Sequence, residues 1–298
     1  MALQVGLLAK QSNDTDLASF QQQDKKPCAS LIALSKHIQH DLSAVATTTR
    51  PGLALCLQVG LDYTKQLVGE TGLLFIPVHH MEAHALTARM VDNSLSFPFL
   101  VLLVSGGHCI LALARNVGDF VILGETLDGA PGEAFDKIAR RLKLQEHPQC
   151  KGMSGGQAIE TLAKEGNIHL LDGKHLFRMQ RKDCNFSFIG FKQAVFRLIQ
   201  EEEKLQGTSN ILENVCDICA SVQHHITRHL VVSGGVASNG YIRHALSRLC
   251  DHTSYKLVCP PPKLCTDNGI MVAWAGMEHL KLGTGLADNP QEVRFEPR

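Results

Sequence analysis

The order of apolar and polar positions along the chain predicts a mixed α/β fold. Residues 43–48 form an apolar run typical of a strand, Arg50-Pro51-Gly52 indicates a turn, and a second buried strand is expected at 73–78. Between the strands, apolar or small side chains recur at the spacing of one helix face: Leu53, Cys56, Leu57, Gly60, Tyr63, Thr64 and Leu67. This strand–helix–strand order predicts a βαβ unit, so part of the sheet is parallel.

The pattern changes after Phe99. Three short strands joined by glycine-containing turns predict an antiparallel meander at 99–104, 108–115 and 120–125. Helices are expected at 132–143, 156–165, 190–204 and 211–229, with a polar stretch at 166–185. The remaining predicted elements are a strand at 230–232, a strand at 255–259 and a helix from Asp267 to about Leu282.

These elements suggest a division into lobes. Residues 1–41 are polar and weakly patterned, and we expect a divergent leader there, with a loop or disordered stretch at 21–26 and ordered structure beginning at Leu42. A first lobe at 42–97 would contain the βαβ unit, and a second lobe at 98–298 would end in the C-terminal helix. The sequences at 103–107 and 231–235 both end an apolar run with Ser-Gly-Gly. This repeat suggests a duplicated, two-lobed architecture with a ligand gripped between the lobes.

Composition and charge exclude several classes of protein. The chain has 298 residues, of which 44% are hydrophobic and 19% charged, which fits a globular protein of one large domain or two. No apolar run approaches the roughly 18 residues that span a bilayer, so we expect no membrane contact. The net charge is zero, so RNA binding would need a local basic patch. There are two candidate patches: one contains Arg140, Arg141 and Lys143, and the other contains Arg178, Arg181 and Lys182. Ordinary solvated surface would explain both equally well.

The cysteines and the N-terminus bear on the compartment. Ten cysteines are scattered, most of them inside apolar runs, which fits a reducing compartment. The N-terminus has no secretory hydrophobic segment. Residues 1–26 lack arginine and contain several acids, which differs from a mitochondrial presequence.

The segment His80-Met81-Glu82-Ala83-His84 is the first candidate for chemistry. It places two imidazoles four residues apart, on one face of a helix, as paired metal ligands are placed. Such pairs are also common in purely structural roles. Glu82 projects to a different side, so it does not occupy the general-base position of zinc proteases. A mononuclear site needs a third ligand, and Asp267 is the best candidate.

The glycine turns and an acidic segment are the other candidates. The bare backbone N–H groups of Ser105-Gly106-Gly107 would bind an anion, so a metal and a phosphate are expected in one cleft. Asp128, Glu133 and Asp136 surround a predicted helix start. They fit a capped helix, with acids at the positive end of its dipole, or a site in which Asp136 contacts a ribose or a metal-bound group.

A zinc-finger interpretation of Cys216-Asp217-Ile218-Cys219, His225 and His229 is weak. The gap between Cys219 and His225 is too short for a finger, and all four positions fall on one predicted helix. We interpret them as core and surface positions.

Taken together, several segments closely resemble the tRNA N6-adenosine threonylcarbamoyltransferase family, historically named O-sialoglycoprotein endopeptidases. The likeness extends from residue 42 to about 296 and is strongest to mitochondrial animal members. The matching segments are 44–60, 76–84, 103–108, 124–137, 185–192, 233–239 and 265–273.

The resemblance implies an actin-like (ASKHA), ribonuclease-H-like fold of two lobes. It implies transfer of threonylcarbamoyl from threonylcarbamoyl-AMP, made by a separate synthase, to N6 of adenosine-37 in tRNAs that read ANN codons. One divalent ion, iron or zinc, would be bound by His80, His84 and Asp267, with no catalytic side chain beyond this site. The residues that would bind the adenylate are Leu103, Val104, Ser105, Gly106, Gly107, Asp136, Gly156, Glu160 and Asn239. A homodimer and a mitochondrial location are implied too, although no presequence is visible and a cytoplasmic location stays open.

Two departures from the family pattern suggest an alternative function. Family members begin with a strand and turn of the form Ile-Glu-Thr-Ser-Cys-Asp-Asp-Thr, and residues 1–41 contain no match. The predicted helix-to-strand connection at 228–232 lacks the usual 2–6 linking residues. The chain therefore resembles a truncated or splice-variant form, and the alternative is an impaired isoform that binds nucleotide or a partner without turnover. A sugar or acetate kinase would not explain the histidine pair, and a metalloprotease lacks its general base.

Overall fold

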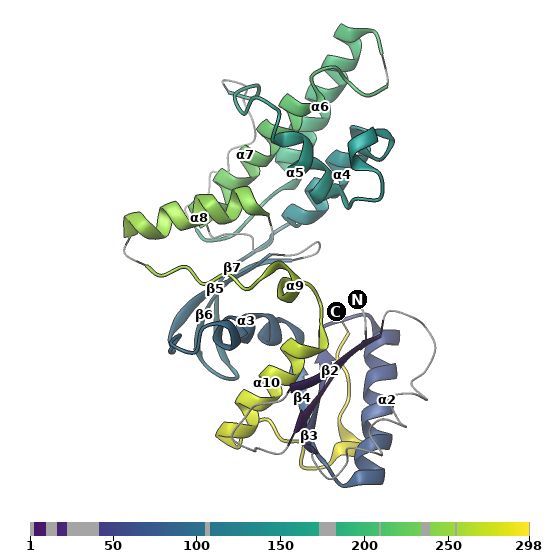
Figure 1. Cartoon of the computed structure of the whole chain (residues 1–298), viewed down its shortest axis with the longest axis vertical. Coiled ribbons are helices and arrows are strands. Elements are labelled where there is room, and N and C mark those ends of the chain that lie inside the picture. The colour runs from purple at the N-terminus through teal and green to yellow at the C-terminus, as the bar shows by residue number, and fades with distance from the viewer. Residues whose placement is uncertain are drawn as a thin grey trace. The chain divides into compact units, whose positions relative to one another are not determined.

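A computed structural model describes the chain as two compact units (Figure 1). Unit 1 contains Met1–Phe99, Ala114–Phe120 and Pro260–Arg298, and unit 2 contains Leu100–Leu113 and Val121–Cys259. The described residues are 3–9, 17–22, 42–104, 108–172, 183–208, 210–233, 239–253 and 255–297, with the backbone alone at 3–9, 17–22 and 229–233. The units differ from the lobes expected at 42–97 and 98–298, because the C-terminal segment packs within unit 1.

Unit 1 is built on a four-stranded sheet in the order β2-β1-β3-β4. β3 (Leu42–Arg50) and β4 (Leu74–His79) are parallel, as the βαβ pattern predicts. β1 (Leu3–Ala9) pairs antiparallel with both β3 and β2 (Leu17–Gln22). The expectation that ordered structure begins at Leu42 is therefore wrong, because two strands precede it. β1 pairs with β3 on one side and with β2 on the other, and a weak local pattern does not reveal such tertiary pairing.

Helices cover both faces of this sheet (Figure 1). Val45 of β3 packs with Leu61, Leu67 and Phe75 in a core beneath α2 (Ala54–Thr71). The neighbouring residues Ala44 and Ala46 face a second core that involves α3 (His80–Val91) and α10 (Gly269–Leu282). Because successive strand residues point to opposite faces, one apolar strand serves both cores. Thus α3, which follows β4, and α10, which follows Asp267, are packed within one core.

The chain after Phe99 forms the predicted meander. β5 (Phe99–Val104), β6 (Cys109–Asn116) and β7 (Asp119–Glu125) make a three-stranded sheet in chain order. Their connections are only two to four residues long, and parallel strands would need a crossover of about a dozen, so neighbouring strands are antiparallel. The β6–β7 turn belongs to unit 1.

Unit 2 is mainly helical around one apolar core. This core includes Ile138, Ile159, Phe191 and Ile218, all of them fully buried. Its helices are α4 (Pro131–Arg141), α5 (Gly155–Ala163), α6 (Ile189–Gln206), α7 (Val215–Ser233) and α8 (Gly240–Thr253). The short helical segments in the described part of the chain are η2 (Leu144–Glu146), η3 (Pro148–Cys150), α9 (Pro262–Cys265) and η4 (Pro290–Glu292), the last two in unit 1.

Two predicted strands are wrong. The strand expected at 230–232 is part of α7, which continues to Ser233. No glycine, asparagine or proline interrupts residues 228–232, so nothing in the sequence ends the helix there. Residues 255–259 are described without strand structure. Gly106, Gly107, Gly234 and Gly235 lie outside the described residues, so both predicted glycine turns do as well. Among the described helices, none combines the length and the apolar character that crossing a membrane requires.

Candidate metal centre and nucleotide-binding residues

The histidine pair is positioned by the junction of β4 and α3. His79 ends the strand and acts as the N-cap of α3, with its Nδ1 accepting a hydrogen bond from the Met81 amide at 3.2 Å. His80 is therefore the first helical residue, and His84 lies one turn later on the same face. The His80 side chain is buried and that of His84 is partly buried.

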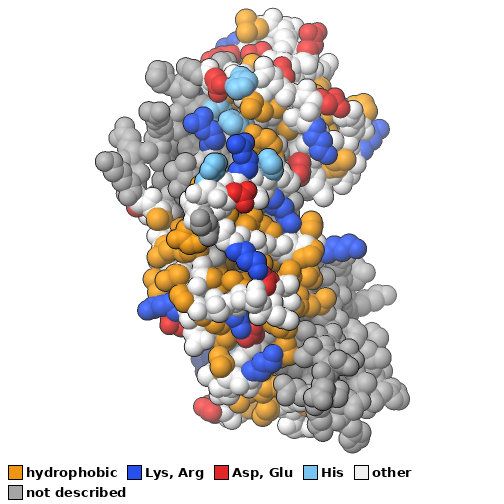
Figure 2. Space-filling model, turned by 60° about the vertical axis from the view of Figure 1, so that its left-hand side comes forward, with side chains coloured by type: hydrophobic (Ala, Val, Ile, Leu, Met, Phe, Trp, Pro, Cys, Tyr) orange, Lys and Arg blue, Asp and Glu red, His pale blue; other side chains and the backbone are white. Residues whose placement is uncertain are grey.

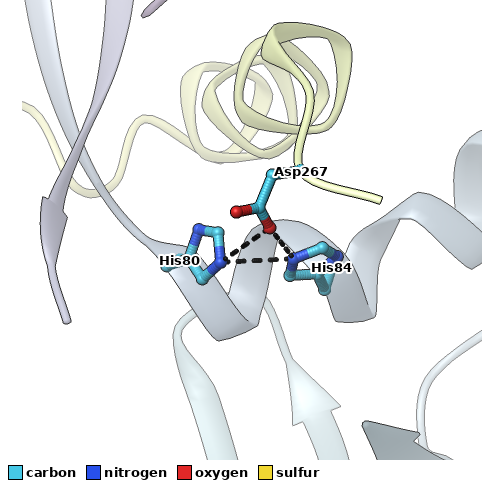
Figure 3. A group of neighbouring side chains, drawn as sticks. All are labelled: His80, His84 and Asp267. Carbon is cyan, nitrogen blue, oxygen red and sulfur yellow. Dashed lines mark hydrogen bonds and ion pairs between the residues drawn. The ribbon is translucent and has the colours of Figure 1, made fainter. Parts of the chain in front are cut away.

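The start of α10 positions the third side chain. Asn268 is the N-cap of this helix, and its Oδ1 accepts a hydrogen bond from the Met271 amide at 2.9 Å. Its Nδ2 donates to the Thr266 carbonyl at 2.7 Å, which folds the chain tightly around Asp267. Figure 3 shows the Asp267 carboxylate pointing from this segment toward both imidazoles.

The three side chains meet at the spacing of metal ligands. The Nε2 atoms of His80 and His84 are 3.3 Å apart, and each lies 3.2 Å from Asp267 Oδ1 (Figure 3). Ligands about 2.0–2.1 Å from a tetrahedral ion lie about 3.3 Å from one another. We call His80, His84 and Asp267 the metal triad. Among the described residues, it is the one group of three such side chains brought this close together.

Hydrogen bonding alone does not satisfy the metal triad. If both Nε2 atoms donate to Asp267 Oδ1, the contact between His80 and His84 brings two donors together without an acceptor. A cation in place of the two protons would accept a lone pair from each nitrogen. The donor set of two imidazoles and a carboxylate suits zinc, iron and related ions without distinguishing between them. The residues present therefore fit a metal.

Electrostatics agree with an ionised Asp267. The hydrogen bonds from His80 and His84 hold the pKa of its carboxyl well below the usual range, although burial acts in the opposite direction. The carboxylate is thus available as an anionic ligand across the neutral pH range.

Four predicted nucleotide-binding residues lie on α5 or next to it in unit 2: Gly156 and Glu160 are on this helix, Asp136 is on α4, and Asn239 precedes α8. A Cβ placed on Gly155, the first residue of this helix, would lie 2.6 Å from the Cα of Asp136 on α4. Gly156 follows, with open space where its side chain would be. Glu160, one turn further on the same face, accepts a hydrogen bond from the amide of Gly240 at 2.9 Å. Gly240 follows Asn239, so the four residues form a continuous series.

The side-chain amide of Asn239 has a fixed orientation. Its Oδ1 accepts a hydrogen bond from the Ile242 amide at 3.1 Å, as the N-cap of α8. Its Nδ2 donates to Gln223 Oε1 on α7 at 3.0 Å, and both side chains are buried. The Ser-Asn-Gly sequence before α8 could have signalled this cap, but the role of Gln223 depends on packing between helices and has no local signal.

The other predicted binding residues are not brought into this series. Leu103 and Val104 lie at the end of β5, and Val104 packs against the apolar core of unit 2. Ser105, Gly106 and Gly107 lie outside the described residues.

The acidic segment has a structural explanation apart from Asp136. Asp128 accepts hydrogen bonds from the Ser187 hydroxyl and from the amides of Phe188 and Gly129, which ties the start of α6 to the loop before α4. Burial raises the pKa of the Asp128 carboxyl, but these hydrogen bonds lower it by more. Glu133 forms an ion pair with Lys137 on α4. Asp136 is exposed, as Asp128 is, whereas Glu133 is partly buried.

The two weaker candidates gain no support. Cys216 and Cys219 lie on α7, and burial raises the pKa of both thiols, which suits packing rather than metal binding. Arg141 forms an ion pair with Glu203, so its charge is compensated. On the face in Figure 2, lysine and arginine side chains are mixed with acidic and histidine side chains. The basic group at 178–182 lies outside the described residues.

Comparison with known proteins decides the family. The family model of the tRNA N6-adenosine threonylcarbamoyltransferases matches residues 27–274. The chain belongs to this family. Its members have the actin-like fold and depend on a metal, so the predicted fold class is confirmed.

Individual relatives cover most of the chain. It is 50% identical to the human mitochondrial tRNA N6-adenosine threonylcarbamoyltransferase over 284 residues, which are 87% of this chain and 68% of the relative. It is 48% identical to the mitochondrial protein of that name from Danio rerio, over 87% of this chain and 70% of the relative. A similar protein from Anaplasma marginale is 40% identical, over 82% and 74% respectively.

Proposed function

We propose that this chain is a tRNA N6-adenosine threonylcarbamoyltransferase that modifies adenosine-37 of tRNAs reading ANN codons. The observation that carries the proposal is the metal triad, with three ligand atoms 3.2–3.3 Å apart in a chain of this family. The donor is threonylcarbamoyl-AMP, supplied by a separate synthase.

The reaction balances without a nucleophile from the protein. The N6 amine of adenosine attacks the carbamoyl carbon, and the bond from that carbon to the phosphate oxygen breaks. AMP leaves with the bonding electron pair, and the amine loses a proton. A metal ion bound by the triad would polarise a carbonyl or offset negative charge. The chain's own contribution is to bind and orient its substrates. Such positioning accounts for a large part of the rate acceleration of a two-substrate reaction.

Asp136, Gly156, Glu160 and Asn239 bind the adenylate in this proposal. The hydroxyl groups of a ribose donate hydrogen bonds, and carboxylates such as those of Asp136 and Glu160 accept them well. The Gly156 amide lies at the N-terminus of α5, where backbone N–H groups are available to a ligand. Leu103, Val104, Ser105, Gly106 and Gly107 complete the proposed site, with the glycines donating backbone N–H groups to phosphate.

The proposed compartment follows the names of the relatives, and the proposed assembly is based on exposed apolar side chains. We propose a mitochondrial location because the human and Danio rerio relatives carry that designation. We also propose a homodimer, in which a second copy covers the exposed apolar side chains of Leu53, Leu55 and Val59 at α2. Sedimentation of the purified chain tests this assembly, and a monomer at micromolar concentration would contradict it.

The alternative of an impaired, nucleotide-binding isoform loses one of its supports. A missing first strand would favour this alternative, because it would leave backbone groups of the sheet unpaired. β1 pairs along one side of β3, from Val5 opposite Thr47 to Ala9 opposite Leu42. The alternative still rests on the two departures from the family pattern, which are the absence of an Ile-Glu-Thr-Ser-Cys-Asp-Asp-Thr match in residues 1–41 and the missing connection at 228–232.

Formation of modified nucleoside with release of AMP tests the proposal. The purified chain is incubated with a defined ANN-reading tRNA, a threonylcarbamoyl-AMP synthase, threonine, bicarbonate and ATP. Digested tRNA is then analysed by mass spectrometry. We expect threonylcarbamoyladenosine at position 37, and a strong loss for Glu160→Gln and Asp136→Asn. AMP binding without any modified nucleoside would favour the impaired isoform instead.

A further inference from the structure

Glu82 lies between the two histidines on α3, yet it takes no part in the metal triad. Its side chain is buried, with 9% of the residue exposed. Oε1 accepts a hydrogen bond from the Gly118 amide in the β6–β7 turn at 2.7 Å. The same oxygen lies 3.2 Å from Nε2 of His279 on α10. A buried carboxylate that carries two partners from distant parts of the chain is costly to leave unpaired.

His279 is equally constrained. It is 8% exposed, and its Nδ1 lies 3.2 Å from the Thr284 hydroxyl, so both ring nitrogens have a partner. A Cβ on Gly285 would lie 2.7 Å from Nδ1, so the backbone after α10 closes tightly over the ring. The imidazole therefore has a fixed place on α10 and gives Glu82 a fixed point of attachment.

This contact joins the two elements that supply the metal triad. α3 carries His80 and His84, and α10 begins two residues after Asp267. The Glu82 side chain projects from the same turn of α3 as the histidines, but on another side of the helix. Its attachment to His279 therefore limits rotation of α3 about its own axis and sliding along α10. Either movement would change the distances between the histidines and Asp267.

We propose that Glu82 and His279 are positioning residues that hold α3 against α10 in the register that the metal triad requires. The proposal rests on the metal binding in the proposed function, but not on the transfer reaction. Residues that orient metal ligands typically change metal affinity about 10- to 100-fold when they are replaced. Sub-ångström errors matter here because the three ligand atoms already lie at ligand spacing.

The chain offers a matched control on the same two helices. Arg89 on α3 donates from Nε to Glu278 Oε1 on α10 at 2.9 Å, and Glu278 is 7% exposed. Arg89 also donates to the Leu95 carbonyl and lies over the Phe97 ring, 4.4 Å from its centroid. This pair holds α3 at its C-terminal end, away from the histidines. Glu82→Gln and Glu278→Gln thus make the same chemical change at two buried α3–α10 contacts.

Binding of Co²⁺ alone to the metal-free chain tests the proposal, because its visible absorption reports both affinity and coordination geometry. We expect Glu82→Gln to lower Co²⁺ affinity about 10- to 100-fold and to change the absorption bands. Glu278→Gln should lower the melting temperature yet keep the wild-type affinity and bands. Glu82→Asp, which keeps the charge on a shorter side chain, should recover part of the affinity.

Three results would overturn the proposal. One is wild-type affinity and absorption bands in a folded Glu82→Gln variant. Another is an equal loss of affinity in Glu278→Gln, which would mean that general packing alone is responsible. The third is a wild-type chain that does not bind Co²⁺, which would remove the metal site too. A wild-type chain that binds Co²⁺ but modifies no tRNA would contradict the proposed function and leave the positioning role intact.

Discussion

Replacement of Gly155 by alanine tests whether the close approach of α4 and α5 positions the proposed nucleotide-binding residues. The new Cβ would lie 2.5 Å from Asp136 Oδ1 and 2.6 Å from Asp136 Cα. Carbon atoms in contact are normally about 3.5–4.0 Å apart, so the shortfall is about 1 Å. The carboxylate can rotate away, but the Cα moves only with α4. The two helices must therefore separate.

The expected magnitude follows from this displacement. Overpacking of a well-packed core costs about 1–3 kcal/mol, and the helix propensity of alanine over glycine recovers at most about 1 kcal/mol. We expect the free energy of unfolding to fall by about 1–2 kcal/mol. Asp136 would also shift against Gly156 by about 1 Å, an error that can reduce catalysis by about 100-fold. AMP affinity should fall at least about tenfold, which corresponds to about 1.4 kcal/mol.

Gly156→Ala is the matched control. No atom lies within 4 Å of its added Cβ, so this variant should be at least as stable as the wild type. If Gly156 faces the nucleotide, the variant should still bind AMP more weakly. Thermal unfolding and calorimetric titration with AMP measure both quantities. Wild-type stability of Gly155→Ala would refute the close approach, and undiminished AMP binding by Gly156→Ala would remove Gly156 from the site.

Three further predictions concern single hydrogen-bonding side chains. Asn268→Ala removes the N-cap of α10, so it should cost about 0.5–2 kcal/mol of stability and weaken metal binding; unchanged metal affinity would contradict the link to the triad. Gln223→Leu leaves the Asn239 amide without its acceptor, so AMP affinity should fall. Gln223→Glu keeps an acceptor and should retain more of that affinity; equal AMP affinities of the two variants would refute this. Asp128→Asn tests a pH dependence: burial raises the pKa of the carboxyl, but hydrogen bonds including that from Ser187 lower it below 3.8 overall. The stabilisation is thus present above about pH 4 and lost as the pH falls toward the lowered pKa, so denaturation of both chains from pH 7 to pH 3 should show the variant's deficit shrinking.

Local periodicity predicted most of the helices and strands because their signals are contained within each segment. The βαβ unit and the meander appear where the apolar spacing placed them. The strand expected at 230–232 failed because β-type residues followed a helix without a residue that ends it, and α7 continued. β1 was missed since its partner β3 begins more than 30 residues later along the chain, and pairing at that distance leaves little trace in local pattern.

The candidate site shows the same limit. Helical spacing and a helix start were sufficient to select His80, His84 and Asp267, which the structure brings together. The contact between Glu82 and His279 joins residues almost 200 positions apart. No spacing rule connects them, so only the packing of α3 on α10 reveals that pair.

Metal-dependent modification of tRNA by the purified chain tests the central claim most directly. The chain is stripped with a chelator, then assayed for threonylcarbamoyladenosine on a defined tRNA before and after stoichiometric zinc or iron is restored, beside His84→Ala. We predict negligible product from the stripped chain, recovery with one metal per chain, and no recovery in His84→Ala. If the stripped chain and His84→Ala each made as much product as the metal-loaded wild-type chain, the account would be contradicted.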